Sequence, residues 1–164
     1  MTDPIIKTLD LPCDAAQAFD IFVNRIAAWW PLDGHAASAA AGKAALAVTI
    51  EPKVGGAVYE TMYDGTRTDW GEVLEFEVGR KLAMTWHPGN NADNPTRVDV
   101  VFDDLPDGGS RVTLTHSGWE VWGDEAADKR GNYDTGWDFV LGQRYAAAAK
   151  QNRRPEGRLR EGAP

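Results

Sequence analysis

The first part of the chain changes from an extended to a helical hydrophobic pattern. Pro4–Leu11 alternates weakly and is rich in β-branched residues, which predicts a first strand. Asp14 followed by Gln17 is a capping-box pattern, in which each residue satisfies a free backbone N–H at the start of a helix. Apolar residues then recur at helical spacing, so we expect an amphipathic helix over about Ala15–Arg25.

A second, short helix is expected immediately afterwards. It covers Ile26–Trp30 and ends before Pro31, because the residue that precedes a proline is disfavoured in helical conformation. The alanine-rich segment His35–Ala45 fits either a helical turn or a loop, and its pattern does not decide between them.

The middle of the chain predicts an antiparallel meander. Short runs of β-forming residues are separated by Gly, Pro and Asp turn signals at close spacing. The six expected strands are Leu46–Glu51, Ala57–Tyr63, Trp70–Phe76, Leu82–Trp86, Thr96–Phe102 and Arg111–His116.

The C-terminal part predicts a loop followed by a long helix. Ser117–Asp134 is rich in glycine and charge and is interpreted as a long loop or lid, whereas Gly136–Lys150 has helical periodicity. Gly142 within that helix suggests a close approach to the sheet. Gln151–Pro164 is expected to be a disordered tail after a single domain over residues 1–150.

These elements predict an α+β fold in which one long helix covers a sheet. A curved antiparallel sheet of about seven strands cannot bury its concave face alone, and the last helix is the only element long enough to cover it. Because a sheet that bends around a helix leaves space beside it, we expect a cavity between them.

Charge argues against some partners. The net charge of the chain is −8, and the fifteen residues from Lys150 onward carry +3, so the preceding body carries −11. An acidic body repels phosphate backbones and anionic lipid, so neither nucleic acid nor a membrane is an expected partner.

The remaining composition favours an intracellular protein without a bound cofactor. Cys13 is the only cysteine and cannot form an internal disulfide, which fits a reducing compartment. The chain starts without a secretory pattern, so the expected location is the cytoplasm. The three histidines lack metal-ligand spacing, and neither a metal site nor a cofactor is expected.

A set of short segments resembles a known family when their order and spacing are taken together. The chain resembles the START-like (SRPBCC) helix-grip superfamily, in the branch related to the C-terminal domain of the activator of Hsp90 ATPase. The matching segments are Trp29-Trp30-Pro31, Glu51–Gly56, Trp70–Leu74, Leu82–Trp86, Val112–Trp119 and Gly136-Trp137. The resemblance implies a helix-grip fold, and the superfamily includes ligand carriers, cyclases, hydrolases and chaperone activators.

Aromatic residues supply the candidate ligand site. Seven tryptophans stand in 164 residues, and several strands present one apolar face that would line a pocket under the last helix. The alternative is that these residues only fill the core. The candidate ligand-binding residues are Tyr59, Trp70, Met84, Trp86, Val100, Leu114, His116, Trp119, Trp137, Leu141 and Tyr145.

Two residues are weak candidates for acid–base chemistry. His116 has the parity of its inward-facing neighbours, so it should point into the cavity. Glu60 lies in a strand whose alternation is ambiguous, and a solvent-facing side chain is favoured there. His35 would lie at the pocket mouth or on the surface.

The leading function is therefore the binding of a small hydrophobic or aromatic molecule. The first alternative is an enzyme of the cyclase, aromatase or hydrolase kind in the same cavity. The second is a protein-interaction role in stress response. A chaperone partner is not favoured, because the Hsp90 activator has an N-terminal domain that this chain lacks. An exposed strand edge leaves both a monomer and a homodimer open.

Overall fold

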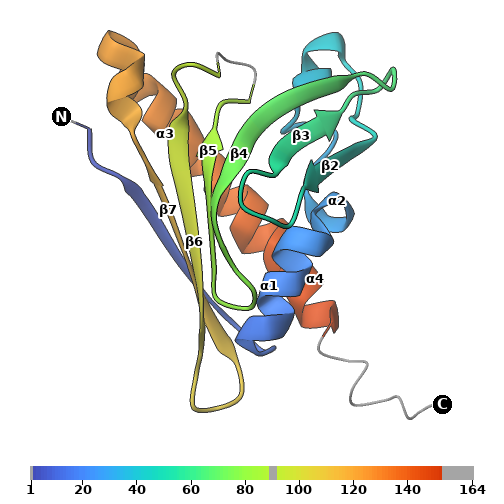
Figure 1. The fold of residues 1–164 in the computed structure, drawn as a ribbon, viewed down its shortest axis with the longest axis vertical. Helices are drawn as coiled ribbons and strands as arrows, with labels where there is room; N and C mark the ends of the chain where they lie inside the picture. The colour runs from blue at the N-terminus through green and yellow to red at the C-terminus, as the bar shows by residue number, and fades with distance from the viewer. Residues whose placement is uncertain (1, 89–91, 153–164) are drawn as a thin grey trace.

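The computed structural model describes residues 2–88 and 92–152 as an α+β fold with one curved sheet (Figure 1). The sheet is antiparallel with strand order β1-β7-β6-β5-β4-β3-β2, so the first strand pairs with the last. The strands are β1 (Ile5–Leu11), β2 (Ala47–Ile50), β3 (Ala57–Thr61), β4 (Arg67–Glu77), β5 (Lys81–Trp86), β6 (Thr96–Asp104) and β7 (Ser110–Ser117).

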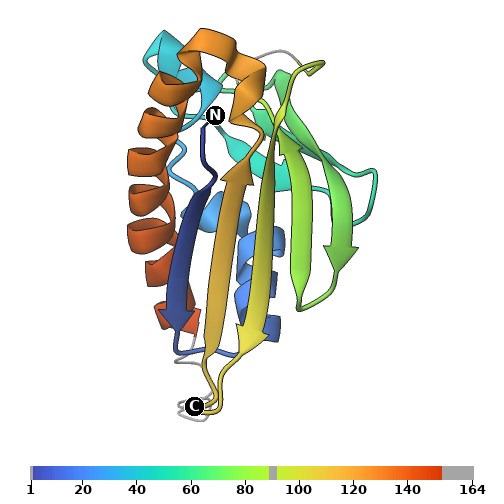
Figure 2. The same ribbon diagram turned by 90° about the vertical axis from the view of Figure 1, so that its left-hand side faces the viewer.

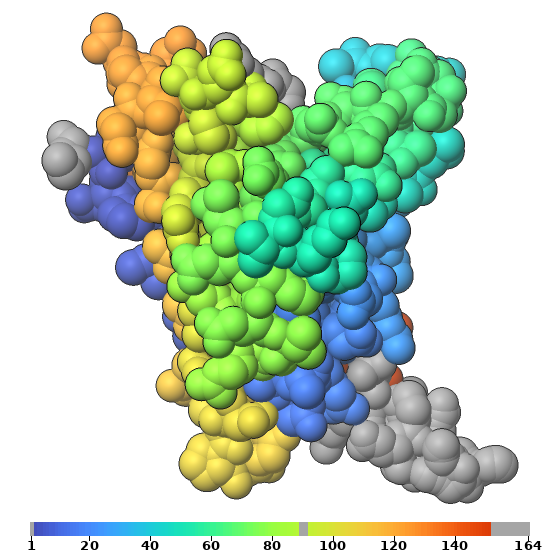
Figure 3. All heavy atoms as spheres, in the orientation of Figure 1, coloured from blue at the N-terminus to red at the C-terminus, as the bar shows by residue number. Residues whose placement is uncertain are grey.

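The helices form two groups on the concave side of the sheet. One group follows β1: α1 (Ala15–Asn24), α2 (Ile26–Trp29) and the 3₁₀ helix η1 (Ala37–Ala41). The other follows β7: η2 (Trp119–Glu125), α3 (Ala126–Phe139), the π-helical segment η3 (Val140–Tyr145) and α4 (Ala146–Asn152). Figure 2 shows this C-terminal helix running beside β1 along the sheet, and in Figure 3 the sheet hides its later part while its first residues show in orange at the upper left. The seven-stranded helix-grip fold predicted from the sequence is confirmed.

Alternation along the strands decides which side chains form the core. In β6 and β7 every second residue is buried, and Val100 lies directly opposite Leu114 while Val98 lies opposite His116. Phe22 and Phe102 fill the space beneath α1, with ring centroids 5.9 Å apart. These contacts make the middle of the sheet–helix interface a packed core. Full burial of such side chains contributes about 1.5–3 kcal/mol each to stability.

The start of α1 confirms the capping box. Asp14 Oδ1 accepts a hydrogen bond from the Gln17 backbone N–H at 2.8 Å, and the Gln17 side chain accepts from the Asp14 N–H at 3.4 Å. The alanine-rich segment between α2 and β2 contains η1, which settles the open choice in favour of a helical turn.

The C-terminal helix is longer than the sequence predicts. The prediction of a loop over Ser117–Asp134 is wrong, because η2 and most of α3 lie there. This stretch is mainly polar and exposed, so it lacks an apolar stripe. Lys7 on β1 holds it through ion pairs with Asp134 at 2.7 Å and Asp138 at 2.8 Å. The helix continues to Asn152, and the predicted tail beyond that residue lies outside the described residues.

The close approach expected at Gly142 is also wrong. A Cβ on this residue would have nothing within 4 Å, and the residue is exposed. The wider turn of η3, in which the Ala146 N–H donates to the Leu141 carbonyl, keeps Leu141 and Tyr145 facing the core and turns Gly142 toward solvent.

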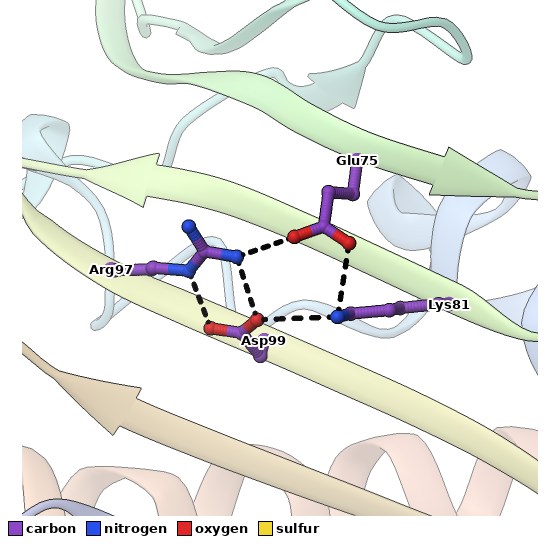
Figure 4. A network of polar contacts seen from close by, with 4 residues as sticks. All are labelled: Glu75, Lys81, Arg97 and Asp99. Atoms are coloured by element: carbon purple, nitrogen blue, oxygen red, sulfur yellow. Dashed lines mark hydrogen bonds and ion pairs between the residues drawn. The ribbon is translucent and has the colours of Figure 1, made fainter.

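Charged side chains connect three strands on the convex face of the sheet. Arg97 on β6 bonds Asp99 at 2.8 Å and Glu75 on β4 at 2.7 Å, and Lys81 on β5 bonds Glu75 at 3.0 Å (Figure 4). Since these groups are partly exposed, each ion pair contributes little to stability. Together the pairs link the solvent-facing side chains of β4, β5 and β6.

Candidate functional site

A pocket of about 280 Å³ opens at the end of the sheet where β5 ends beside α3. One wall is aromatic, and the other consists of small residues from the segment before η1 and from α3. The lining residues are Trp30, Gly34, His35, Ala36, Ala37, Trp86, Pro88, Tyr133, Gly136, Trp137 and Val140. An apolar cavity of about 150 Å³ holds benzene, so this pocket has room for roughly two fused rings.

Three tryptophans form the aromatic wall, and each comes from a different element. The ring centroids are 5.9 Å apart for Trp30 and Trp86, 5.6 Å for Trp86 and Trp137, and 6.0 Å for Trp30 and Trp137. Trp70 supports this wall from behind, 5.5 Å from Trp86. Each of the three wall residues is almost fully buried, so close packing holds the wall in place.

His116 positions Trp137 and does not face the pocket. The Trp137 indole N–H donates to His116 Nδ1 at 3.0 Å, and because an indole can only donate, Nδ1 carries no proton. The proton therefore lies on Nε2, which is 2.7 Å from Thr96 Oγ1, and that hydroxyl donates to the Trp86 carbonyl at 2.9 Å. Burial lowers the pKa of His116 to about 3, so the ring is neutral and both its nitrogens are used.

The polar groups of the pocket are few. Burial raises the pKa of Tyr133, against a smaller lowering by the Trp86 N–H. Burial also lowers the pKa of His35, opposed by Asp33 and assisted by Arg144. The His35 ring stacks on Phe139 with centroids 5.4 Å apart, at the mouth where the sequence suggested it. Both side chains are therefore neutral at neutral pH, one a donor and the other able to accept a proton.

Glu60 is buried, so the preference for a solvent-facing side chain is wrong. Its carboxylate accepts hydrogen bonds from the Ala37 N–H at 2.6 Å, the Ser38 N–H at 2.9 Å, the Ser38 hydroxyl at 2.7 Å and the Trp70 indole at 3.3 Å. These donors come from η1 and β4, which the local alternation of β3 cannot reveal. Glu60 does not line the pocket but anchors the segment that does.

The structure separates the predicted ligand-binding residues into four groups. Trp86 and Trp137 line the pocket. Trp70, His116 and Trp119 stand behind these walls. Tyr59 lies on the convex side under the Arg67 guanidinium, 4.0 Å from the ring centroid, and so is turned away from the cavity. The predicted residues that instead lie in the packed core are Met84, Val100, Leu114, Leu141 and Tyr145.

Sequence reasoning missed most of the small wall and Tyr133. Tyr133 lies four residues before Trp137, so a helix extended upstream would have placed both on one face. The contribution of Trp30 and residues 34–37 depends on how the α2–β2 connection folds back, which no periodicity reports.

Two features are absent from the described residues. Within residues 2–88 and 92–152, no group of three or more His, Cys, Asp or Glu side chains is arranged to hold a metal ion. In the same ranges, no helix has the length and apolar character that crossing a bilayer requires.

Similar structures share this architecture. A structure described as an anthrahydroquino-gamma-pyrone synthase, Txn09, solved as a complex, is 29% identical, with a TM-score of 0.60 over 89% of this chain and 96% of that one. Protein CV1439 from Chromobacterium violaceum is 18% identical, with a TM-score of 0.64 over 91% and 99%. DynU16, from the dynemicin biosynthetic locus, is 17% identical with a TM-score of 0.62 over 90% of this chain, which spans only 47% of DynU16.

The family assignment comes from the sequence as a whole. No curated protein sequence matches the chain. Residues 13–148 match the family model described as Activator of Hsp90 ATPase homolog 1-like protein. This range includes α1, the six strands β2–β7 and nearly all of the C-terminal helix. The chain therefore belongs to the family of Activator of Hsp90 ATPase homolog 1-like proteins and has the START-like helix-grip fold.

Proposed function

We propose that this protein binds a small, flat, largely apolar aromatic molecule in the pocket between β5, α3 and the segment before η1. The observation that carries the proposal is the wall of Trp30, Trp86 and Trp137 around about 280 Å³ of open space. A folded core normally closes such space with side chains, whereas here four of the lining residues are glycine or alanine: Gly34, Ala36, Ala37 and Gly136. The family and its fold support a role in ligand binding.

Gly136 allows this proposal to be tested by filling the pocket. It lies in α3, and a Cβ built on it would come no closer than 4.0 Å, to His35 Cδ2. In Gly136→Leu the larger side chain enters the cavity without a backbone clash, and replacing a helical glycine does not weaken the helix. Gly131→Leu is the matched control, because Gly131 lies in the same helix with nothing within 4 Å of its built Cβ.

Tetralin, a bicyclic hydrocarbon, is a suitable probe, and its binding can be followed by isothermal titration calorimetry. We expect saturable binding to the wild type and to Gly131→Leu, and at least tenfold weaker binding to Gly136→Leu. Equal binding by both variants would place the site elsewhere, and no binding by the wild type would refute the proposal.

The second candidate is a cyclase-like enzyme that uses the same pocket. The observation that favours it is the 29% identity to a protein named as an anthrahydroquino-gamma-pyrone synthase. In this chain His35 and Tyr133 are the pocket groups that could move a proton, while His116 and Glu60 are fully engaged elsewhere. A fused tetracycle exceeds the pocket volume, so binding of a smaller molecule ranks first.

Turnover of an anthrahydroquinone substrate, followed by liquid chromatography with mass spectrometry, tests the enzyme candidate. The expected result is product with the wild type and a loss of rate in His35→Asn and Tyr133→Phe. The absence of product with the wild type would count against this reaction without affecting the binding proposal.

A further inference from the structure

One wall of the pocket holds a buried donor without an acceptor. Trp86 is 3% exposed, and its indole Nε1 has no hydrogen-bond partner among the described residues. The other buried indoles, on Trp29, Trp30, Trp70, Trp119 and Trp137, each donate to a protein acceptor. An unsatisfied buried donor is costly to a folded protein and is uncommon, so the exception at a pocket wall calls for an acceptor.

Tyr133 also lines the cavity and lies near this donor. The Trp86 indole is near enough to lower the pKa of the Tyr133 hydroxyl, but the Trp86 N–H has no hydrogen-bond partner. A rotation that brings the Trp86 N–H onto the Tyr133 oxygen would satisfy this buried donor. The Tyr133 proton then points to the cavity, and a phenol that accepts one hydrogen bond donates a stronger one. Burial keeps the phenol protonated, so it remains a donor.

The charge around the pocket favours a neutral ligand over an ionic one. No lysine or arginine is among the lining residues, although Arg144 acts on His35 from nearby. Residues 119–139 carry six carboxylates against two cations, so the balance disfavours an anion. An ammonium ion could rest on the tryptophan faces, but it would offer no acceptor to the two donors. A neutral molecule with an acceptor atom satisfies both constraints.

We propose that the bound molecule is an aromatic carbonyl compound, whose oxygen accepts a hydrogen bond from Tyr133 while the Trp86 N–H supports that hydroxyl from behind. This inference rests on the proposed function and adds the chemical class of the ligand. Tyr133 and Trp86 are then the residues that distinguish a ketone or quinone from a hydrocarbon of the same shape.

A matched pair of probes tests this assignment. 1-Tetralone and tetralin share a bicyclic skeleton and differ by one carbonyl oxygen. We define the discrimination ratio as the Kd of tetralin divided by the Kd of 1-tetralone, which cancels the shared burial of the rings. Tyr133→Phe and Trp86→Phe each remove one donor and keep an aromatic ring, and Tyr63→Phe is the control because Tyr63 is exposed and outside the pocket.

The expected result is a ratio that falls about tenfold in Tyr133→Phe and about threefold or more in Trp86→Phe, with tetralin affinity preserved in Tyr133→Phe. Tyr63→Phe should keep the wild-type ratio. The infrared stretch of the 1-tetralone carbonyl gives a second measurement on the wild type alone. It should lie at lower frequency when bound than in a hydrocarbon solvent.

Three outcomes would overturn the inference. Binding of both probes with an unchanged ratio in Tyr133→Phe, together with an unshifted carbonyl stretch, would remove the donor role and leave the aromatic pocket standing. Tighter binding of phenyltrimethylammonium than of 1-tetralone would assign the pocket to cations. Binding of neither bicyclic probe to the wild type would refute the proposed function, and this inference with it.

Discussion

Replacing Glu60 by glutamine tests whether one buried carboxylate holds the small wall of the pocket. The change keeps the size and shape of the side chain but converts one acceptor oxygen into an NH₂ group. In the wild type, one carboxylate oxygen accepts from the Ala37 N–H and the Trp70 indole, and the other accepts from both donors of Ser38. Wherever the new NH₂ group is placed, it faces at least one N–H that cannot rotate away.

The expected cost follows from counting these donors. Placing the NH₂ group beside Ser38 is the better choice, because the serine hydroxyl can turn and accept while only the Ser38 N–H is orphaned. An orphaned buried donor costs about 1–3 kcal/mol, and the remaining bonds lose their charge assistance at roughly 1 kcal/mol or less each. We therefore expect a loss of about 3 kcal/mol, which for a domain of this size lowers Tm by about 6–12 °C.

Urea unfolding followed by tryptophan fluorescence measures this loss. Glu72→Gln is the matched control, because Glu72 is exposed on β4 and should change the free energy of unfolding by less than about 0.5 kcal/mol. Tetralin affinity should also fall in Glu60→Gln, since η1 follows directly from the pocket wall. A free energy of unfolding within about 0.5 kcal/mol of the wild type would refute the anchoring role.

Three further predictions concern the sheet and the buried histidine. Gly71→Ala would place a Cβ 1.9 Å from the Thr85 carbonyl oxygen, so we expect at least about 3 kcal/mol of lost stability in urea unfolding, whereas Gly131→Ala should be neutral or stabilising. Arg97→Met should cost about 1 kcal/mol at low salt and less in 1 M NaCl, and a salt-independent loss would contradict an ion-pair origin. Between pH 7 and pH 5 the wild type should lose about 2 kcal/mol more stability than His116→Gln, because the unfolded histidine takes up a proton near pH 6.5 while burial lowers its folded pKa to about 3. Parallel pH profiles of the free energy of unfolding would contradict this.

Local pattern predicted those parts of the fold that depend on local interactions. The capping box at Asp14 and the alternation of β6 and β7 are formed by residues close together in sequence or by a uniform period of two. The stretch 117–134 was misjudged for the opposite reason. Lys7, more than a hundred residues away, pairs with Asp134 and Asp138 of this helix, and the mainly polar stretch carries only a weak periodic signal.

By itself, the sequence determined the helix-grip architecture, the inward faces of β5–β7 and the presence of Trp86 and Trp137 in the pocket wall. Only the tertiary structure decided where the cavity lies and what its polar groups do. Tyr145 and Phe22 fill the middle of the interface, and the tryptophan-lined pocket lies where the glycine and alanine segment meets α3. Packing also turned Glu60 inward and placed both ring nitrogens of His116 in hydrogen bonds. Local pattern could not show this, because the partners of these two side chains come from elements distant in sequence.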